Sequence, residues 1–291
     1  LFRSVNIVGN PNVGKSTLMN QLVGEKLSIA TFKAQTTRHR IMGIVNTEDT
    51  QIVFSDTPGV LKPNYKMQEM MLQFSESALA DADILLYVTD VVEDPEKNMD
   101  FLEKVSKMSI PVILLINKID ESDQKTLGNL VTKWHGLLPN AEILPISAKN
   151  KFGVDILLKR VHELLPESPA FFDKDQLTDK PAKFFVSEII REKILRYYDK
   201  EIPYSVEVVI ERFKEDDRQI HISAIIYVER SSQKGIIIGH QGMALKKVST
   251  EARKSLERFF DKKIFLETFV KVDKDWRNSQ KELKHFGYSP E

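Results

Sequence analysis

The octapeptide Gly9-Asn10-Pro11-Asn12-Val13-Gly14-Lys15-Ser16 constrains the fold of this 291-residue chain more than any other feature. It lies between a short β-rich apolar run and an amphipathic stretch, so we expect a strand, a glycine loop and a helix in that order. Glycines at both ends allow close approach of the backbone to a ligand, and N–H groups at a helix start attract anions. The pattern G-x-x-x-x-G-K-[ST] predicts a phosphate-binding loop in which Lys15 contacts the outer phosphates and Ser16 offers a hydroxyl to Mg²⁺. A glycine turn with a chance Lys-Ser pair is the alternative.

Up to about residue 165 the chain alternates strand-like and helix-like segments. Apolar runs predict buried strands at residues 5–8, 51–54, 84–88, 112–116 and 142–146, and apolar spacing predicts helices at 16–23, 65–79, 95–108, 127–137 and 154–165. This alternation predicts an α/β domain whose mainly parallel sheet is covered by helices on both faces. Ligands of such sheets bind beyond the carboxyl ends of the strands.

Three further motifs follow predicted strands. In Asp56-Thr57-Pro58-Gly59, Asp56 would hold the metal through water and Gly59 would offer its N–H to the terminal phosphate. In Asn117-Lys118-Ile119-Asp120, Asp120 would accept hydrogens from the N1–H and 2-amino groups of guanine, which adenine lacks; a helix cap is the alternative. Ser147-Ala148-Lys149 would support the same base through backbone N–H groups. The motifs together predict binding of GTP and GDP. The alternative that the chain is an ATPase is inconsistent with Asp120, because adenine lacks the hydrogens that this carboxylate would accept.

The pattern changes after the last of these helices. The polar stretch has no clear period, so we expect a nucleotide-binding domain at 1–166, a linker at 167–180 and a second domain at 181–291. In the second domain the sequence predicts a helix at 183–198 and strands of alternating hydrophobicity at 204–213 and 219–229. Two helices separated by a glycine-containing loop follow, then a strand at 263–271 and a C-terminal helix at 276–285. That order is α-β-β-α-α-β with an antiparallel character.

The helical pair carries a G-x-x-G loop, Gly239-His240-Gln241-Gly242, preceded by apolar residues. KH modules clamp about four single-stranded nucleotides with such a loop, because its glycines let the RNA backbone approach. Residues 230–263 have a net charge of +6, which suits an anionic partner. We therefore expect RNA to contact Ile238, Gly239, His240, Gln241, Gly242, Lys246 and Lys247. A helix-turn-helix hairpin whose glycines serve only as caps is the alternative.

Composition excludes several other classes of protein. The chain has no Cys, which rules out a disulfide scaffold, a Cys-ligated metal site and a thiol nucleophile. Its longest apolar runs are about five residues, far short of the ~20 that cross a bilayer, so we expect no transmembrane helix. The chain begins at Leu1 rather than Met, which leaves open a preceding segment or a removed targeting peptide.

The nucleotide motifs, in this order and spacing, resemble the translation-factor-like GTPases. The resemblance implies that Thr37, in Gln35-Thr36-Thr37-Arg38, ligates Mg²⁺ only when the third phosphate is present. It implies Ser16, Thr37 and Asp56 as the Mg²⁺ site and Lys15, Thr37 and Gly59 as the catalytic residues. The expected nucleotide contacts are Asn10, Pro11, Asn12, Val13, Gly14, Lys15, Ser16, Thr17, Asp56, Gly59, Asn117, Lys118, Asp120, Ser147, Ala148 and Lys149.

The residue after Gly59 departs from the Ras pattern. Ras-type enzymes orient the attacking water with a glutamine there, whereas this chain has Val60, so we expect slow intrinsic hydrolysis. Related GTPases with an asparagine in the phosphate loop, and a switch that begins near Thr31, place K⁺ where an arginine finger would otherwise lie. Asn12 matches that asparagine and is our candidate K⁺ ligand; hydrogen bonding within the loop is the alternative.

The combination of these motifs with Gln35-Thr36-Thr37-Arg38-His39-Arg40 and the second domain resembles the Era family of the TrmE-Era-EngA-like GTPase superfamily along essentially the whole chain. The resemblance implies a P-loop GTPase domain followed by a smaller α+β type II KH domain. It implies binding to the 3′ end of small-subunit ribosomal RNA and a role in maturation of the small ribosomal subunit. It also implies a cytoplasmic protein of bacterial type, with peripheral contact to the inner membrane described for the family. We expect a monomer.

Two alternatives of other classes stay open at this point. In the first, the nucleotide state gates a protein-interaction or peripheral membrane module that has no direct RNA recognition. In the second, the chain is a tRNA-modification GTPase with the same Thr36-Thr37-Arg38 switch; those enzymes carry a functional C-terminal cysteine, which this chain lacks.

Overall fold

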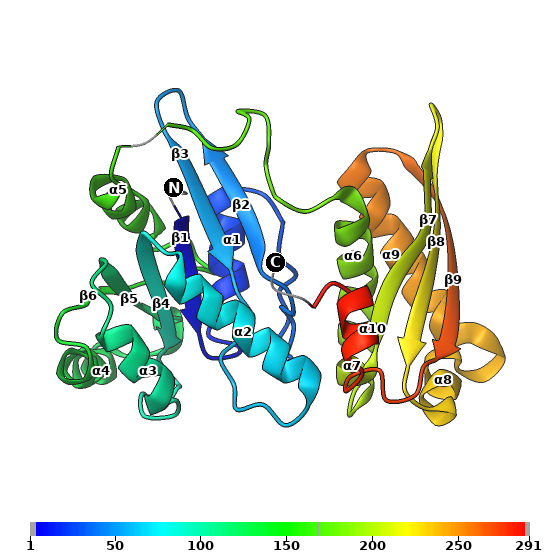
Figure 1. Cartoon of the computed structure of the whole chain (residues 1–291), viewed down its shortest axis with the longest axis horizontal. Coiled ribbons are helices and arrows are strands. Elements are labelled where there is room, and N and C mark those ends of the chain that lie inside the picture. The colour runs from blue at the N-terminus through cyan, green and yellow to red at the C-terminus, as the bar shows by residue number, and fades with distance from the viewer. Residues whose placement is uncertain (1–3, 168, 289–291) are drawn as a thin grey trace. The chain divides into compact units, whose positions relative to one another are not determined.

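The structure is a computed structural model, and it describes residues 4–167 and 169–288. Residue contacts divide the chain into two units, and the boundary between their main parts falls between Asp179 and Lys180 (Figure 1). Leu1, from which the sequence analysis raised the possibility of a preceding segment, lies outside the described residues.

The first unit is built on a six-stranded sheet with the strand order β2-β3-β1-β4-β5-β6. Its strands are β1 (Ser4–Gly9), β2 (Ile41–Asn46), β3 (Gln51–Asp56), β4 (Ile84–Asp90), β5 (Val112–Asn117) and β6 (Glu142–Pro145). Neighbouring strands run parallel, except that β2 and β3 form an antiparallel pair. The expectation of a mainly parallel sheet is confirmed.

Helices cover both faces of this sheet (Figure 1). They are α1 (Lys15–Val23), α2 (Lys66–Ala80), α3 (Met99–Ser106), α4 (Gln124–Leu137) and α5 (Val154–Leu164). Side chains of α2, α3 and α4, among them Ala78, Phe101 and Trp134, share one core cluster with sheet residues such as Leu114. On the opposite face α1 lies beside α5. Burial on two faces explains why the central strands are rich in apolar residues.

The register of the parallel strands brings the predicted motifs to one edge of the sheet. Ile7 pairs with Asp56, and Asp90 pairs with Asn117. The carboxyl ends of β1, β3, β4 and β5 are therefore level with one another. The loops that follow these strands meet above that edge, where α/β sheets bind their ligands.

Two strands of the first unit differ from expectation. The prediction missed β2, because Gly43 interrupts its apolar pattern. A Cβ at Gly43 would lie 2.6 Å from side-chain atoms of Met19 and Val23, so glycine is required where β2 passes over α1. Residues 142–146 were expected to form a buried strand. A strand, β6, does form there, but it lies at the edge of the sheet and is half-buried or exposed along its length, so the expected burial was wrong.

The segment expected as a linker, 167–180, makes hydrogen bonds to β2 over part of its length. The N–H of Ile44 donates to the carbonyl of Leu177 at 2.8 Å. The hydroxyl of Thr178 donates to the carbonyl of Met42 at 2.7 Å. This part of the segment therefore extends the β2 edge of the first sheet.

The second unit is a three-stranded sheet, order β7-β8-β9, with helices packed against one face (Figure 1). Its elements are α6 (Ala182–Tyr197), α7 (Ile202–Ser205), β7 (Glu207–Glu215), β8 (Gln219–Val228), α8 (Ser231–Ile238), α9 (Met243–Phe260), β9 (Lys263–Val272) and α10 (Gln280–His285). Alternate residues of the strands, such as Ile222 and Val270, enter a core shared with α6, α8 and α9. The predicted α-β-β-α-α-β order is confirmed.

The antiparallel character holds only for β7 and β8, because β9 runs parallel to β8. A parallel return needs a long crossover, which α8 and α9 supply. The one-turn helix α7 was not predicted. Within the described residues no helix is both long and apolar enough to cross a membrane.

Candidate functional site

The loop after β1 requires glycine at two positions. Gly9 has a φ of +146°, and a Cβ there would lie 2.1 Å from the carbonyl oxygen of Val88. Gly14 has a φ of +99°, and its Cβ would lie 2.2 Å from Nδ2 of Asn117. Asn12 also has a positive φ, of 68°, which asparagine tolerates better than most residues. Since α1 begins directly after the loop, the N–H groups of its first turn face an anion bound there.

Lys15 folds back against the loop. Its Nζ donates to the carbonyl oxygens of Gly9 at 3.0 Å and Asn10 at 2.7 Å. Burial lowers the pKa of Lys15 to about 8, while the nearby carboxylates of Asp56 and Glu93 act in the opposite direction. A phosphate bound in the loop would give this ammonium a charged partner at contact distance and raise its pKa again.

The three residues expected to hold Mg²⁺ lie together. The hydroxyls of Ser16 and Thr37 are 2.7 Å apart, and Oγ1 of Thr37 lies 3.5 Å from Oδ2 of Asp56. Asp56 is fully buried, and burial raises the pKa of its carboxyl group. Among the described residues, nothing forms a hydrogen bond with the second carboxyl oxygen, Oδ1.

This donor set fits Mg²⁺. Magnesium in nucleotide sites takes one or two protein carboxylates or hydroxyls, keeps several waters and binds substrate phosphates. A cation here would offset the cost of burying the unpartnered oxygen of Asp56 and lower the pKa of that carboxyl group. In residues 4–167 and 169–288 no cluster of three or more His, Asp or Glu side chains is arranged to hold a metal by itself.

Gly59 has no room for a side chain, whereas the side chain of Val60 fills part of the core. A Cβ at Gly59 would lie 2.7 Å from backbone atoms of Pro11, so only glycine lets the two loops approach. The N–H of Val60 donates to the carbonyl of Gly9 at 3.0 Å, and the Val60 side chain is 4% exposed in the core beneath the loop. The side chain after Gly59 thus points into the core.

Asn117 joins two loops of the site. Its Nδ2 donates to the carbonyl of Val13 at 2.8 Å, and its Oδ1 accepts from the N–H of Ala148 at 2.9 Å. All three residues are buried. In this structure the side chain of Asn117 therefore serves as a strut between the phosphate loop and the loop after β6.

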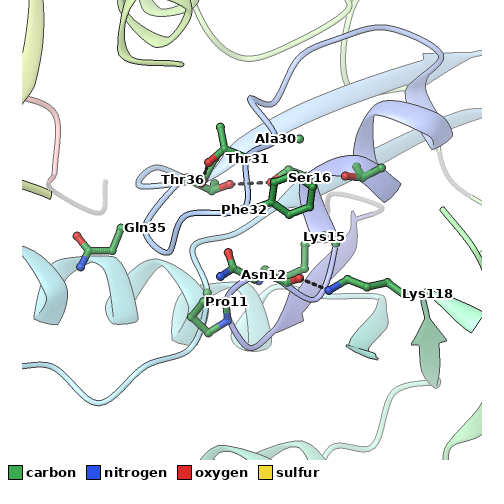
Figure 2. A pocket seen from close by; sticks show the side chains of 14 residues that line it. Pro11, Asn12, Lys15, Ser16, Ala30, Thr31, Phe32, Gln35, Thr36 and Lys118 are labelled. Atoms are coloured by element: carbon green, nitrogen blue, oxygen red, sulfur yellow. Dashed lines mark hydrogen bonds between the residues drawn. The ribbon is translucent and has the colours of Figure 1, made fainter. Parts of the chain in front are cut away.

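Lys118 lies across the phosphate loop. Its Nζ donates to the carbonyl of Asn12 at 2.7 Å, the dashed line between these two residues in Figure 2. The same ammonium lies 2.5 Å from Oδ2 of Asp90, which is largely buried. The carboxylate thus holds the lysine against the loop.

Asp120 is fixed but open to solvent. One of its oxygens accepts a hydrogen bond from the hydroxyl of Ser147 at 2.6 Å, and the residue is exposed. A carboxylate held in this way is poised to accept the two hydrogens of a guanine edge. Ala148 is buried and Lys149 is exposed beside it.

The residues expected to bind the phosphates line one pocket (Figure 2). Among the expected contacts it is lined by Pro11, Asn12, Gly14, Lys15, Ser16, Thr17, Thr37, Gly59 and Lys118. Asn10 and Val13 are buried under the loop instead, where their carbonyls accept from Lys15 and Asn117. The pocket is also lined by Ala30, Thr31, Phe32, Gln35 and Thr36, which sequence reasoning did not place there as contacts.

Two supporting residues were missed. Asp90 ends β4, and the rule that functional groups gather at the carboxyl ends of parallel strands was a usable signal for it. Asn98 donates to the side chain of Asn10 and, at 3.2 Å, to the carbonyl of Val60. It precedes α3 in a loop, and no sequence signal indicated it.

In the second unit, α8 ends in the G-x-x-G loop. Gly239 has a φ of +70°, and a Cβ there would lie 2.6 Å from the Cβ of Ala244. Gly242 also has a positive φ, of 76°, and a Cβ there would meet open space. His240 and Gln241 between them are exposed, as a loop that contacts a ligand requires.

A groove lies beside this loop, between the helical pair and β9. Its lining includes apolar side chains from Ile225, Ile238, Leu245 and Phe269, together with Lys234 and Lys271. Of the residues expected to contact RNA, Ile238 lines the groove, whereas Lys246 and Lys247 are exposed on α9 outside its lining. The ammonium of Lys247 lies 4.5 Å from the ring centroid of Tyr197.

These features define a guanine-nucleotide-binding P-loop protein with a KH module. Family models agree: residues 4–118 match the 50S ribosome-binding GTPase family and residues 201–277 match the KH domain family. The chain is 46% identical to the GTPase Era of Geobacter sp. strain M21 over 291 residues, covering 99% of this chain and 98% of that protein. It is 44% identical to the GTPase Era of Clostridium kluyveri over 286 residues, covering 98% of each. The chain belongs to the Era family of GTPases.

Solved structures support the same assignment. The chain is similar to Era in complex with MgGDPNP and nucleotides 1506–1542 of 16S ribosomal RNA, with a TM-score of 0.95, 37% identity and 99% coverage of both chains. It is equally similar to an Aquifex aeolicus Era variant bound to GDP·AlF₄⁻, with a TM-score of 0.94, 37% identity and 99% coverage of both. The fold of both units, a P-loop GTPase domain and a KH domain, is therefore confirmed.

Proposed function

We propose that this chain is a GTP-dependent switch that binds the single-stranded 3′ end of small-subunit ribosomal RNA and acts in maturation of the small ribosomal subunit. The observation that carries the proposal is the similarity, over 99% of both chains, to an Era structure that holds MgGDPNP and 16S ribosomal RNA together. This chain has candidate residues for both the nucleotide site and the RNA site. The proposal takes 1–166 as the GTPase domain, 167–180 as the linker and 181–291 as the KH domain.

For the nucleotide, each residue has a separate task. The N–H groups around Gly14 and the ammonium of Lys15 bind the β- and γ-phosphates, and Asp120 selects guanine. When bound, Mg²⁺ neutralises charge on the phosphate oxygens. Thr37 and the N–H of Gly59 contact the third phosphate, so the loops that carry them are ordered with GTP and released after hydrolysis.

Hydrolysis depends on groups other than the side chain after Gly59. The buried side chain of Val60 supports the expectation of a slow intrinsic rate, on the order of the unassisted Ras rate. We propose K⁺ as the missing positive charge, with Asn12 as a ligand, because Asn12 and Thr31 line the same pocket. Turnover measured in KCl and in NaCl at equal ionic strength tests this. We expect faster turnover in KCl, and an Asn12→Ala variant that loses the difference; equal rates for the native protein would overturn the K⁺ site.

For RNA, the G-x-x-G loop and its groove supply the recognition. The backbone N–H groups and the positive φ angles of Gly239 and Gly242 allow close approach of a phosphate chain. The apolar floor formed by Ile238 and Leu245 suits unstacked bases. Exposed Lys246 and Lys247 add phosphate contacts.

The test is a titration of fluorescent RNA with the sequence of the small-subunit rRNA 3′ tail, with GDPNP and with GDP. We expect tighter binding with GDPNP by about 5- to 150-fold, the usual range for allosteric coupling. Gly239→Asp combined with Gly242→Asp should abolish RNA binding and leave nucleotide affinity intact. Failure of the native protein to bind this RNA in either state would favour the protein-interaction alternative.

The same proposal extends to cellular location, oligomeric state and membrane contact. We propose a cytoplasmic monomer with peripheral contact to the inner membrane, supported by the similarity to bacterial Era proteins. Sedimentation velocity at micromolar concentration tests the monomer. Flotation with vesicles of bacterial lipids tests the membrane contact.

A further inference from the structure

The sheet of the second unit has one face away from α6, α8 and α9, and that face carries exposed aromatic rings. Ile264 and Val270 of β9 point into the core, whereas Phe265 and Phe269 alternate with such residues and point outward. Phe265 is 51% exposed and Phe269 is 49% exposed. Both rings are half in contact with water, and apolar side chains gathered on one face are a feature of interaction surfaces.

Part of this outer face is covered by the protein itself. The ring of Phe286, just after α10, packs against Tyr227 of β8 with centroids 5.3 Å apart. The register places Phe269 beside Ile225 and Phe265 beside His221, further along the same face. The end of the face that holds Phe265 and Phe269 therefore remains accessible.

This accessible end is continuous with the RNA groove. Phe269, Ile225 and Lys271 of the outer face line the same groove as Ile238 and Leu245 beside the G-x-x-G loop. A chain that fills the groove therefore contacts Phe269, and its next nucleotides meet the sheet face. Phe265 lies four residues back along β9, about 13 Å away at the rise of a strand.

The charges around the rings favour a nucleic acid. Lys263 and Lys271 flank the two rings on the outer side of β9, and the groove is lined by Lys234 and Lys271 and by one carboxylate, Glu211. None of these three lysines forms an ion pair within the described part of the chain, although Glu267 lies between the rings. Protein interfaces are depleted of Lys and Glu at their centres, whereas single-stranded nucleic acids bind to aromatic rings set among basic residues.

We propose that this face is a second RNA-binding surface, on which Phe269 and Phe265 stack bases of the single-stranded segment that continues out of the G-x-x-G groove. The inference rests on the proposed RNA-binding function and extends its footprint. Four-stranded sheets of other RNA-binding modules present aromatic rings to two or three bases in the same way. The ring of His221, whose centroid lies 5.4 Å from that of Phe265, supports the outer platform.

The experiment compares a short and a long RNA on the full chain. One fluorescent RNA of five nucleotides fills only the groove, and one of twelve nucleotides adds the flanking single strand. Phe265→Leu keeps apolar bulk but removes the aromatic plane, and Phe265→Tyr keeps the plane. Phe171→Leu, at an exposed phenylalanine of the first unit, is the matched control.

We expect Phe265→Leu to weaken binding of the long RNA on the order of tenfold and to leave the short RNA unchanged. Phe265→Tyr and Phe171→Leu should match the native protein with both RNAs. As a second readout that needs no variant, 4-thiouridine placed along the long RNA should cross-link to peptide 263–271 of the native protein.

The experiment distinguishes failure of the second RNA-binding surface from failure of the proposed function. If Phe265→Leu binds the long RNA like the native protein while the double variant Gly239→Asp, Gly242→Asp abolishes binding, the second surface is refuted and the proposed function stands. If Phe265→Leu keeps RNA affinity but loses association with purified small ribosomal subunits, the face contacts protein and the inference is wrong. If the native protein binds neither RNA, the proposed function itself fails and the inference fails with it.

Discussion

Replacing Asn117 tests whether its side chain is a structural strut. In Asn117→Ala the carbonyl of Val13 and the N–H of Ala148 both lose their hydrogen-bond partner in a buried position. Leaving one buried polar group unsatisfied costs about 1–3 kcal/mol. Two such groups, partly relieved by water entering the new space, give an expected loss of about 3 kcal/mol in the free energy of unfolding.

The assay must report on the first unit alone. The chain has two tryptophans, of which Trp134 is buried in the first core, 5.7 Å from the ring of Tyr87. A Trp276→Phe background therefore makes fluorescence a probe of the first unit. With a urea m-value of about 2 kcal/mol/M for a unit of this size, the nucleotide-free midpoint should fall by about 1.5 M.

Two further variants sharpen the result. Asn117→Asp still accepts from Ala148 but directs a carboxylate oxygen at the carbonyl of Val13, so it should be at least as unstable as the alanine variant. Asn140→Ala, at an exposed asparagine, should not change the midpoint. If Asn117→Ala unfolds at the native urea concentration without nucleotide, the strut does not stabilise the fold and the reasoning is refuted.

Other predictions concern the phosphate end. Because the pKa of Lys15 is about 8 in the free protein and rises beside phosphate, GDP binding should take up most of one proton at pH 8.5 and almost none at pH 7. The affinity for GDP should accordingly fall as the pH rises above 8; calorimetry in two buffers checks this, and absence of proton uptake at pH 8.5 contradicts it. Asp90→Asn, which weakens the hold on Lys118, should lower GDP affinity about tenfold at unchanged preference for GDP over ADP in competition titrations. Gly59→Ala places a methyl group 2.7 Å from backbone atoms of Pro11 and should weaken GDPNP binding more than GDP binding; equal losses would argue against a GTP-specific approach of this loop.

The nucleotide-binding end of the fold could be predicted from local motifs, because each motif follows a strand and a parallel sheet places the ends of its strands at one edge. Glycine is needed at Gly9 and Gly14 because a Cβ there would meet Val88 of β4 and Asn117 of β5, and the G-x-x-x-x-G-K-[ST] spacing marks both positions without knowledge of these neighbours. The carboxyl ends of parallel strands lie at one edge whatever the rest of the sequence, and Asp56 and Asn117 lie at that edge.

Features that depend on the register of distant segments were not accessible from the sequence. The apolar run of β2 is broken by Gly43, and its reason is the side chains of α1 beneath it. The groove beside the G-x-x-G loop combines Ile238 with Phe269, far along the chain, and only the parallel pairing of β8 and β9 places them together. Asp90 was not singled out from the sequence, and its task becomes visible only from the ammonium of Lys118, which lies 2.5 Å from its carboxylate.

The position of Val60 shows why the departure from the Ras pattern is more than a missing side chain. The backbone N–H of Val60 is bonded to Gly9, and its side chain fills the core under the phosphate loop. A glutamine placed there would have to bury an amide in that core, which costs free energy, or break the bond to Gly9 to reach the pocket. We therefore expect a group that polarises the attacking water to come from another part of the pocket. The polar side chains that line it include those of Asn12, Thr31 and Gln35.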